Sequence, residues 1–471
     1  ALVSTPELLF CTATLKRGET ATITATNSTI AVNTVITVDE VTNSTTFTFI
    51  TNVVDQTGKN ATIEKPMSEG TGFTHMPAPA YGVYHQRRLA VPFRHSVDAS
   101  DDSYTDRKIF DEIIISDIVD TDTYDQIFGQ FRFNAGKSDF NVGMLSFSDD
   151  KLIVFNRNSI HLVDGTENLS IASAKLLTDE VGLVARNSAV QVGNQILFLS
   201  DNGVYGLNFI DLYNLRGNEV PLSESIQKTI DTINKAHADK ASAVYFDNKY
   251  YLAVPTGSST VNNTLLIYNF LNNSWESIDS VNNKDLSGTE FSSFEFTKLL
   301  VTGKGLDKGV YVTNTDGGIH KLEVWGDGID RVITDIGETT ETETRVQGSA
   351  TTRMFTLKSI DRKKFNNFEL HLQSGPDNSS DVSIAANTEN LDSKVTDADG
   401  NLVDGAIDLK KASDYIGGVI APDEDVSIRG RIGNKRAYGL QVTLTNILGR
   451  PRFRSLKIAG AETFRSTSSV Q

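Results

Sequence analysis

The first part of the chain alternates apolar and polar residues at a period of two. The pattern is clear in Thr20–Thr24, Val32–Val41 and Thr45–Ile50, and polar turns separate these runs. Successive side chains of a strand point to opposite faces, so this alternation places one face on a core and the other in water. We therefore expect a small N-terminal β domain over residues 1–66.

A degenerate repeat follows, in which a tight polar turn precedes a short apolar strand and a second turn and strand come after it. The clearest copies are Phe147–Phe155, Val192–Leu199 and Phe246–Val254, with weaker copies at Tyr84–Val91 and Asp307–Val312. A propeller blade takes roughly 40–50 residues, and the copies recur at such intervals, with insertions in the longer ones.

The apolar strands of the repeat are continuous instead of alternating. A blade sheet lies between two neighbouring sheets, so its inner strands are buried on both faces and need apolar residues at every position. We expect a β-propeller of five or six blades over residues 81–326, with one helical insertion near 223–236 that Ser223 caps. A β-sandwich with several hairpins is the alternative for this range.

The last part of the chain predicts a third β domain, a C-terminal β-sandwich over residues 345–471. An acidic, Thr-rich stretch before it, Asp335–Arg345, is typical of a connector or an exposed hairpin. The expected strands of the sandwich are Phe365–Leu372, Val382–Ala385, Val426–Ile432, Leu440–Thr445 and Phe453–Ile458. The predicted fold class is all-β.

Composition narrows the classes of function. The 471 residues include 44 Lys and Arg against 60 Asp and Glu, which gives a net charge of -16 and a pI near 4.9. Affinity for phosphates comes mostly from basic residues, so tight nucleic-acid binding is disfavoured. No apolar run approaches the roughly 20 residues that span a bilayer, so we expect no membrane anchor. The single cysteine, Cys11, excludes an internal disulfide and a Cys-based zinc site.

Three groups of residues are candidates for metal binding. His75, His85 and His95 have a spacing that suits neither one helix face nor a zinc module. Asp397–Asn401 resembles a calcium loop, but Asp408 stands where an EF-hand has its closing Glu. An acidic series, more typical of a solvated loop, comprises Asp117, Asp120, Asp122 and Asp125. We expect no metal and no cofactor.

Catalytic motifs are absent from the sequence. We find no repeated Asp-box, no Gly-x-Ser-x-Gly elbow, no His-Glu-x-x-His pair and no phosphate-binding glycine loop. We therefore expect no catalytic residue and a chain that is not an enzyme. Propeller glycosidases need two carboxylates across a pocket, and the abundant Asp and Glu leave that alternative open.

Basic residues are concentrated near the carboxyl end. Most charged side chains are exposed, so the water-facing side of a sandwich explains them. The functional alternative is a seam that docks on an acidic surface of a neighbouring subunit. The residues are Arg429, Arg431, Lys435, Arg436, Arg450, Arg452, Arg454 and Lys457.

Three sets of short stretches carry a family resemblance. They are Gly18–Thr24 with Val35–Val38 and Thr46–Phe49, then His85–Leu89 with Gly182–Asn194, and then Arg429–Arg431 with Arg436–Val442 and Gly449–Phe453. Together they resemble structural tail proteins of tailed bacteriophages, in particular the nozzle (tubular) proteins of short-tailed phages.

The resemblance implies a virion component of the phage tail, a nozzle or hub subunit that forms part of the conduit for genome ejection. It implies a homo-oligomeric ring, expected to be a hexamer, with portal-adaptor and tail fibre proteins as partners. DNA would pass in transit, because an acidic wall repels duplex phosphates. Two alternatives remain open: a tail adhesin that binds a host surface receptor or glycan, and a propeller glycoside hydrolase.

Overall fold

The computed structural model describes the backbone of the N-terminal strands and most of the chain from residue 81 onward. The described residues are 2–4, 20–25, 34–43, 46–49, 61–64, 81–93, 111–124, 128–134, 137, 139–211, 214–217, 220–281, 284–290, 294–314, 318–322, 328–333, 341–358, 362–376, 378–388 and 407–462. The chain divides into two compact units, Ala1–Glu224 and Ser225–Gln471. This boundary falls inside the range expected for one propeller, so the domain bounds and the blade count stay predictions.

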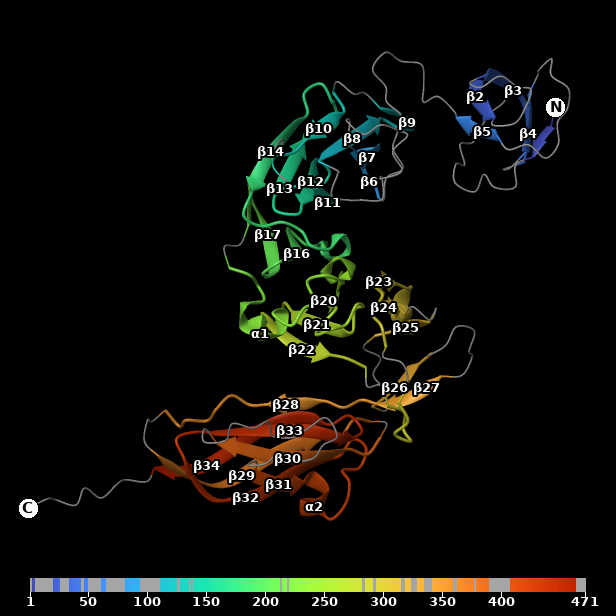
Figure 1. Ribbon diagram of the computed structural model, residues 1–471. Coiled ribbons are helices and arrows are strands. Elements are labelled where there is room, and N and C mark those ends of the chain that lie inside the picture. The colour runs from blue at the N-terminus through green and yellow to red at the C-terminus, as the bar shows by residue number, and fades with distance from the viewer. Residues whose placement is uncertain are drawn as a thin grey trace, which may run out of the picture. The chain divides into compact units, whose positions relative to one another are not determined.

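The first unit begins with a five-stranded antiparallel sheet in the order β1-β4-β3-β2-β5 (Figure 1). Its strands include all three runs expected from the alternating pattern, which confirms those elements. The strands are β1 (Leu2–Ser4), β2 (Thr20–Ala25), β3 (Thr34–Asn43), β4 (Thr46–Phe49) and β5 (Ala61–Glu64).

Three further antiparallel sheets of the first unit follow one another along the chain. In each of them, paired strands are consecutive in sequence, apart from one pair in the first sheet. The first sheet has β6 (Val83–His85), β7 (Arg88–Phe93), β8 (Glu112–Asp117), β9 (Asp120–Tyr124) and β10 (Gln130–Arg132). The second has β11 (Asn141–Phe147), β12 (Lys151–Asn156), β13 (Ile160–Asp164) and β14 (Ser173–Thr178). The third has β15 (Val190–Val192), β16 (Gln195–Ser200), β17 (Gly203–Asp211) and β18 (Asn214–Gly217).

Strand β12 shows why the inner strands read as continuous apolar runs. All six of its residues are buried. Leu152 and Val154 belong to a core shared with the first sheet, whereas Ile153 and Phe155 belong to a core shared with the third. The ring of Phe155 lies 5.4 Å from that of Phe198 on β16. Alternate side chains thus serve two neighbouring sheets, as the stacked blades of a propeller require.

The second unit repeats this arrangement. One sheet comprises β19 (Ser242–Phe246), β20 (Lys249–Val254), β21 (Thr264–Asn269) and β22 (Ser274–Asp279), and the next comprises β23 (Lys298–Thr302), β24 (Gly309–Thr313) and β25 (Ile319–Lys321). The two sheets share one apolar core, in which Tyr251 and Ile267 of the first sheet join Leu299 and Val312 of the second. The repeat copies expected from the sequence are therefore strands, and the fold class is all-β with propeller-type blades.

The expected helix near 223–236 is wrong in length and in its cap. The segment holds a short 3₁₀ turn (Glu224–Ile226), a single α-helical turn α1 (Gln227–Ile230) and a second 3₁₀ turn (Ala238–Lys240). Ser223 does not cap α1, because Ile226 occupies the N-cap position, and the hydroxyl of Ser223 accepts a hydrogen bond from the backbone N–H of Val204 at 3.0 Å.

A short ribbon and a β-sandwich complete the second unit (Figure 1). The ribbon pairs β26 (Ile329–Val332) with β27 (Thr342–Arg345), so part of the stretch expected as a connector or hairpin is a strand. One sandwich sheet has the order β28-β33-β30-β31 and the other β32-β29-β34. Their elements are β28 (Ser349–Thr351), β29 (Lys363–Gln373), β30 (Asp381–Thr388), β31 (Ile407–Lys411), α2 (Ala412–Ile416), β32 (Asp425–Ala437), β33 (Leu440–Leu448) and β34 (Arg452–Glu462).

The two sandwich sheets bury one apolar core between them, to which Phe368 and Leu370 contribute from one sheet and Ile384 and Val442 from the other. Each of the five strands expected here is present. No helix among the described residues is long and apolar enough to cross a membrane.

Candidate functional site

The turn between β6 and β7 has an unusual backbone. Gln86 and Arg87 both lie in the left-handed region, with φ of 47° and 64°. Two-residue hairpin turns of this kind favour Asn, Asp or Gly, because other residues meet steric strain there. The corresponding turn between β19 and β20 uses Asp247 and Asn248, at 47° and 59°. Strain held by the surrounding structure is more frequent at functional sites, so the β6–β7 turn is a candidate.

Arg88 fixes this turn to two other segments. Its side chain is buried, and its guanidinium donates to the backbone carbonyl of Ser116 at 2.8 Å and to that of Glu167 at 3.2 Å. A carboxylate oxygen of Asp117 lies 3.7 Å away. The planar guanidinium has several donors in fixed directions, so one side chain holds both carbonyls. Arg88 therefore positions the loop that carries Glu167.

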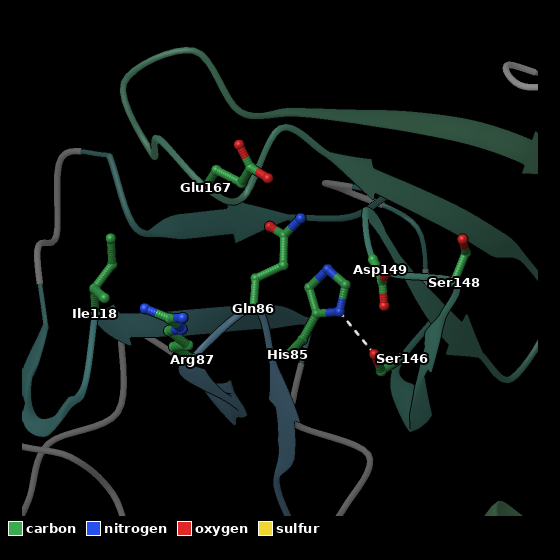
Figure 2. Close-up of a pocket in the computed structure, with 8 residues that line it drawn as sticks. All are labelled: His85, Gln86, Arg87, Ile118, Ser146, Ser148, Asp149 and Glu167. Carbon is green, nitrogen blue, oxygen red and sulfur yellow. Dashed lines mark hydrogen bonds between the residues drawn. The ribbon is translucent and has the colours of Figure 1, made fainter.

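A cavity of about 640 Å³ opens where these segments meet the turn between β11 and β12. Figure 2 shows His85 between Gln86 and Asp149, with Glu167 on the opposite side of Gln86. The side chain of Gln86 accepts a hydrogen bond from the hydroxyl of Thr166, which fixes it against the Glu167 loop. We call this space the His85 cavity. It lies within the first unit.

His85 is the most buried ionisable residue that lines the cavity, with 4% of its surface exposed. Its Nδ1 is 2.7 Å from the hydroxyl of Ser146, whereas its Nε2 has no hydrogen-bond partner among the described residues. In Figure 2 the ring directs Nε2 away from Ser146, toward the space between Gln86 and Asp149. Burial lowers the pKa of His85, although the carboxylates of Asp150 and Asp149 oppose that shift. The ring is therefore neutral at pH 7 and offers one ring nitrogen to a ligand.

The lining of the cavity is almost entirely polar. It includes the exposed carboxylates of Asp149 and Glu167, the exposed guanidinium of Arg87 and the hydroxyls of Ser146 and Ser148. A site with several donors and acceptors and one net negative charge suits a ligand rich in hydroxyl groups. Two carboxylates on one cavity are also the minimum set for cleavage of a glycosidic bond.

A second polar cluster of the first unit contains a serine, a histidine and an aspartate, but it is a closed network. The carboxylate of Asp139 accepts hydrogen bonds from the hydroxyl of Ser159 at 2.6 Å and from Asn134 at 2.9 Å. The same hydroxyl lies 3.1 Å from Nε2 of His161, so the serine lies between the acid and the base. A nucleophilic triad places the histidine in the middle, and this cluster therefore does not activate its serine.

The metal candidates of the sequence are not brought together. Among the described residues, no group of three or more His, Cys, Asp or Glu side chains could hold a metal ion. His85 lines the cavity, and Asp117 contacts Arg88. The side chains of Cys11, His75, His95, Asp120, Asp122, Asp125 and the stretch Asp397–Asn401 lie outside the described residues.

Sequence reasoning missed the cavity residues Gln86, Arg87, Asp149 and Glu167. Each stands in a polar turn or loop, where such residues are ordinary. The one signal in the sequence was a hairpin turn without Asn, Asp or Gly, at Gln86 and Arg87, between two strand-like segments.

Comparisons with known proteins give no family and only weak structural likenesses. No protein-family model and no curated protein matches the sequence. An exo-β-1,3-galactanase from Phanerochaete chrysosporium aligns over 82% of this chain and 95% of its own, with 10% identity and a TM-score of 0.28. A protein described as a glycoside hydrolase aligns over 82% and 96%, with 9% identity and a TM-score of 0.24. The extracellular domain of a one-component system from B. thetaiotaomicron aligns over 62% and 42%, with 12% identity and a TM-score of 0.27.

These matches correct one expectation from the sequence. The chain was expected not to be an enzyme, but solved structures that align with most of it are glycoside hydrolases. The three structures named here do not include a tail protein. At such TM-scores the likeness assigns neither activity nor substrate, so the cavity has to carry the functional argument.

Proposed function

We propose that this chain binds a saccharide in the His85 cavity and cleaves a glycosidic bond there. The observation that carries the proposal is a polar cavity with two carboxylates, Asp149 and Glu167, beside a buried neutral histidine whose Nε2 has no partner among the described residues. A sugar offers hydroxyl groups that match this set of donors and acceptors. His85 and Gln86 would orient the sugar ring, and Arg87 would contact it from the rim.

The two carboxylates supply the chemistry. Glycosidic cleavage needs one carboxyl group that protonates the leaving oxygen and one carboxylate that acts as base or nucleophile on the other side of the sugar. Glu167 is on the loop that Arg88 holds, and Asp149 is on the β11–β12 turn, so the two acids come from different segments of the cavity. A sugar seated between those segments would have one acid on each side.

The test combines binding and turnover. The purified full chain is titrated with neutral oligosaccharides of several linkages by calorimetry, and reducing ends are counted during long incubations. Glu167→Gln and Asp149→Asn should each lower turnover by about 100-fold or more. Glu180→Gln is the matched control, because Glu180 is an exposed carboxylate of the same unit that does not line the cavity.

The outcomes separate the two parts of the proposal. Turnover that survives both cavity variants would remove the catalytic assignment. Binding without any turnover would keep the saccharide site and favour a glycan-binding adhesin. No binding to any member of the panel would reject the proposal as a whole.

A second candidate is the phage tail subunit that the sequence resembles. One observation favours it: the third stretch of the resemblance supplies Arg429, Arg431 and Arg452 to an exposed sheet surface on an acidic chain, which suits contact with another protein. In this proposal the chain forms a ring in the virion, bound to portal-adaptor and fibre proteins, and DNA passes through it. Electron imaging of the purified chain tests it, since a closed ring with an axial channel favours the conduit and dispersed monomers count against it.

A further inference from the structure

One apolar side chain interrupts the polar lining of the His85 cavity. Of the described residues that line the cavity, Ile118 alone is apolar, and it is 50% exposed. Figure 2 shows Ile118 and Asp149 at opposite ends of the labelled residues, with Arg87 and His85 between them. The cavity therefore has a polar end beside Asp149 and, at its other end, an apolar surface that is open to the space.

The turn that carries Ile118 has a strained backbone. Ile118 and Val119 connect β8 to β9, and Val119 has a φ of 62°. The left-handed second residue of such a turn is ordinarily Gly or Asn, and a β-branched residue is a genuine outlier there. Val119 is the one β-branched residue among the described non-glycine residues with positive φ. It is 72% exposed, so burial in a core does not explain its presence.

Hydrogen bonds fix this turn to the neighbouring β6–β7 turn. The backbone N–H of Val119 donates to the carbonyl of Arg87 at 2.8 Å. Just before the turn, the hydroxyl of Ser116 accepts from the backbone N–H of Leu89 at 2.8 Å, and the carbonyl of Ser116 accepts from the guanidinium of Arg88. Ile118 is thus held at the cavity before a ligand binds. A preformed contact of this kind adds little ordering cost to binding.

Positive φ angles are concentrated around the cavity. Gln86, Arg87 and Ser148 line it, with φ of 47°, 64° and 57°. Together with Val119 they are four of the twelve described non-glycine residues that have such a backbone. Strained residues cluster at ligand sites, where the surrounding structure imposes the conformation. The strain at Val119 therefore groups the β8–β9 turn with the cavity.

We infer that Ile118 contacts the aglycone, the non-sugar group, of a glycoside whose sugar occupies the polar part of the cavity. The substrate class is an aryl or alkyl glycoside. An apolar group that covers Ile118 removes apolar surface from water, which favours binding. The hydroxyl groups of a second sugar would instead lose water there and gain no hydrogen bond from this side chain.

The size of the cavity agrees with a ligand of this class. Its volume of about 640 Å³ is within the range of sites that enclose drug-sized ligands, so a sugar with an attached aryl group is of suitable size. The inference rests on the proposed saccharide site, but it does not depend on cleavage, because contact with Ile118 affects binding alone. The experiment therefore measures affinity and not turnover.

The full chain is titrated by calorimetry with pairs of methyl and phenyl glycosides that share one sugar and one linkage. The panel covers both anomers of glucose, galactose, mannose and xylose, together with disaccharides of the same sugars. The phenyl glycoside of the recognised sugar should bind about tenfold more tightly than its methyl partner. Ile118→Ser should reduce this ratio to about twofold or less and leave the affinity for the methyl glycoside unchanged, whereas Ile118→Leu should keep the ratio.

The matched control is Ile278→Ser. Ile278 is an isoleucine of the second unit that is 51% exposed and does not line the cavity, so this variant should keep the tenfold ratio. Thermal unfolding midpoints check that each variant is folded, and Ile118→Ala replaces Ile118→Ser if the serine variant does not fold. The ratio of two affinities in one variant also separates loss of the aglycone contact from a general loss of active protein.

The outcomes distinguish this inference from the proposed function. A chain that binds none of these sugars would reject the saccharide site and this inference with it. Equal affinity for methyl and phenyl glycosides would keep the saccharide site and overturn the aglycone contact. A phenyl preference that survives Ile118→Ser, or that Ile278→Ser removes as well, would also overturn it. Tighter binding of a disaccharide, without any phenyl preference, would assign this end of the cavity to a second sugar instead.

Discussion

Replacing Arg88 by Lys should detach the Glu167 loop while leaving the charge of the site unchanged. Arg88 donates to two carbonyls in different segments, those of Ser116 and Glu167. A lysine ammonium is a single point of donation on a flexible stem and can hold only one of them. The other carbonyl then loses a charge-assisted hydrogen bond, which contributes about 1.5–3 kcal/mol. We expect the local free energy of opening to fall by roughly that amount.

Hydrogen exchange measures this loss where it occurs. Amides of the loop at residues 165–172 should exchange about ten- to one-hundredfold faster in Arg88→Lys than in the wild type. The blade β19–β22, which belongs to the second unit, serves as the internal reference. The control is Arg87→Lys, the same substitution one residue earlier at an exposed side chain, which should change stability by about 0.5 kcal/mol at most.

Two results would refute the reasoning. Equal exchange in Arg88→Lys and Arg87→Lys would show that the buried guanidinium does not hold the loop. Faster exchange confined to β8, with the Glu167 loop unchanged, would show that only the bond to Ser116 matters. In the predicted case, saccharide affinity should fall together with loop protection, because Glu167 then samples more positions.

Two further predictions concern stability. Gly182→Ala should destabilise the first unit by about 2–3 kcal/mol, because a Cβ there would lie 2.2 Å from the carbonyl oxygen of Arg157. The control is Gly418→Ala, where the added Cβ would meet open space. An unchanged thermal unfolding midpoint in Gly182→Ala would contradict the prediction. Burial lowers the pKa of His85, His161 and His320, so below about pH 6.5 the unfolded chain takes up protons that the folded chain resists. The free energy of unfolding, measured with urea, should therefore be highest above about pH 6.5 and fall as the pH is lowered toward 5. The loss is at most about 1.4 kcal/mol per pH unit for each histidine. A free energy of unfolding that does not change over this pH range would contradict the prediction.

The strands could be predicted because their burial is encoded locally. The run Lys151–Phe155 is apolar almost throughout since its alternate side chains enter two different cores. The sandwich strands were equally predictable, because one face of each sheet packs on the core and the other faces water. This gives apolar residues at alternate positions, as at Phe368, Leu370 and Leu372. The helix expected at 223–236 is a single α-helical turn between two 3₁₀ turns, and the hydroxyl of Ser223, expected as its cap, bonds to Val204 of β17, a partner that a local sequence pattern does not record.

The cavity could not be predicted for a related reason. Gln86, Asp149 and Glu167 are far apart in sequence, and they meet because two neighbouring sheets stack and place their turns at the same edge. A polar residue in a turn is expected whether or not it binds a ligand, so the sequence offered nothing to distinguish these positions. His85 alone was singled out, and for a metal site that the described residues do not form.

The buried nitrogen of His85 is the strongest reason to expect a ligand. A buried donor or acceptor without a partner costs about 1–3 kcal/mol, and of the twelve such side-chain atoms among the described residues, Nε2 of His85 is the one that belongs to the lining of the cavity. The hydroxyl of Ser146 can donate to Nδ1 or accept from it, so that bond is compatible with either ring tautomer, and Nε2 is a donor in one tautomer and an acceptor in the other. A sugar hydroxyl both donates and accepts, so it would pair with Nε2 in either tautomer and recover the cost. A ligand with only one hydrogen-bonding character would do so in one tautomer alone, which is why a saccharide fits this cavity best.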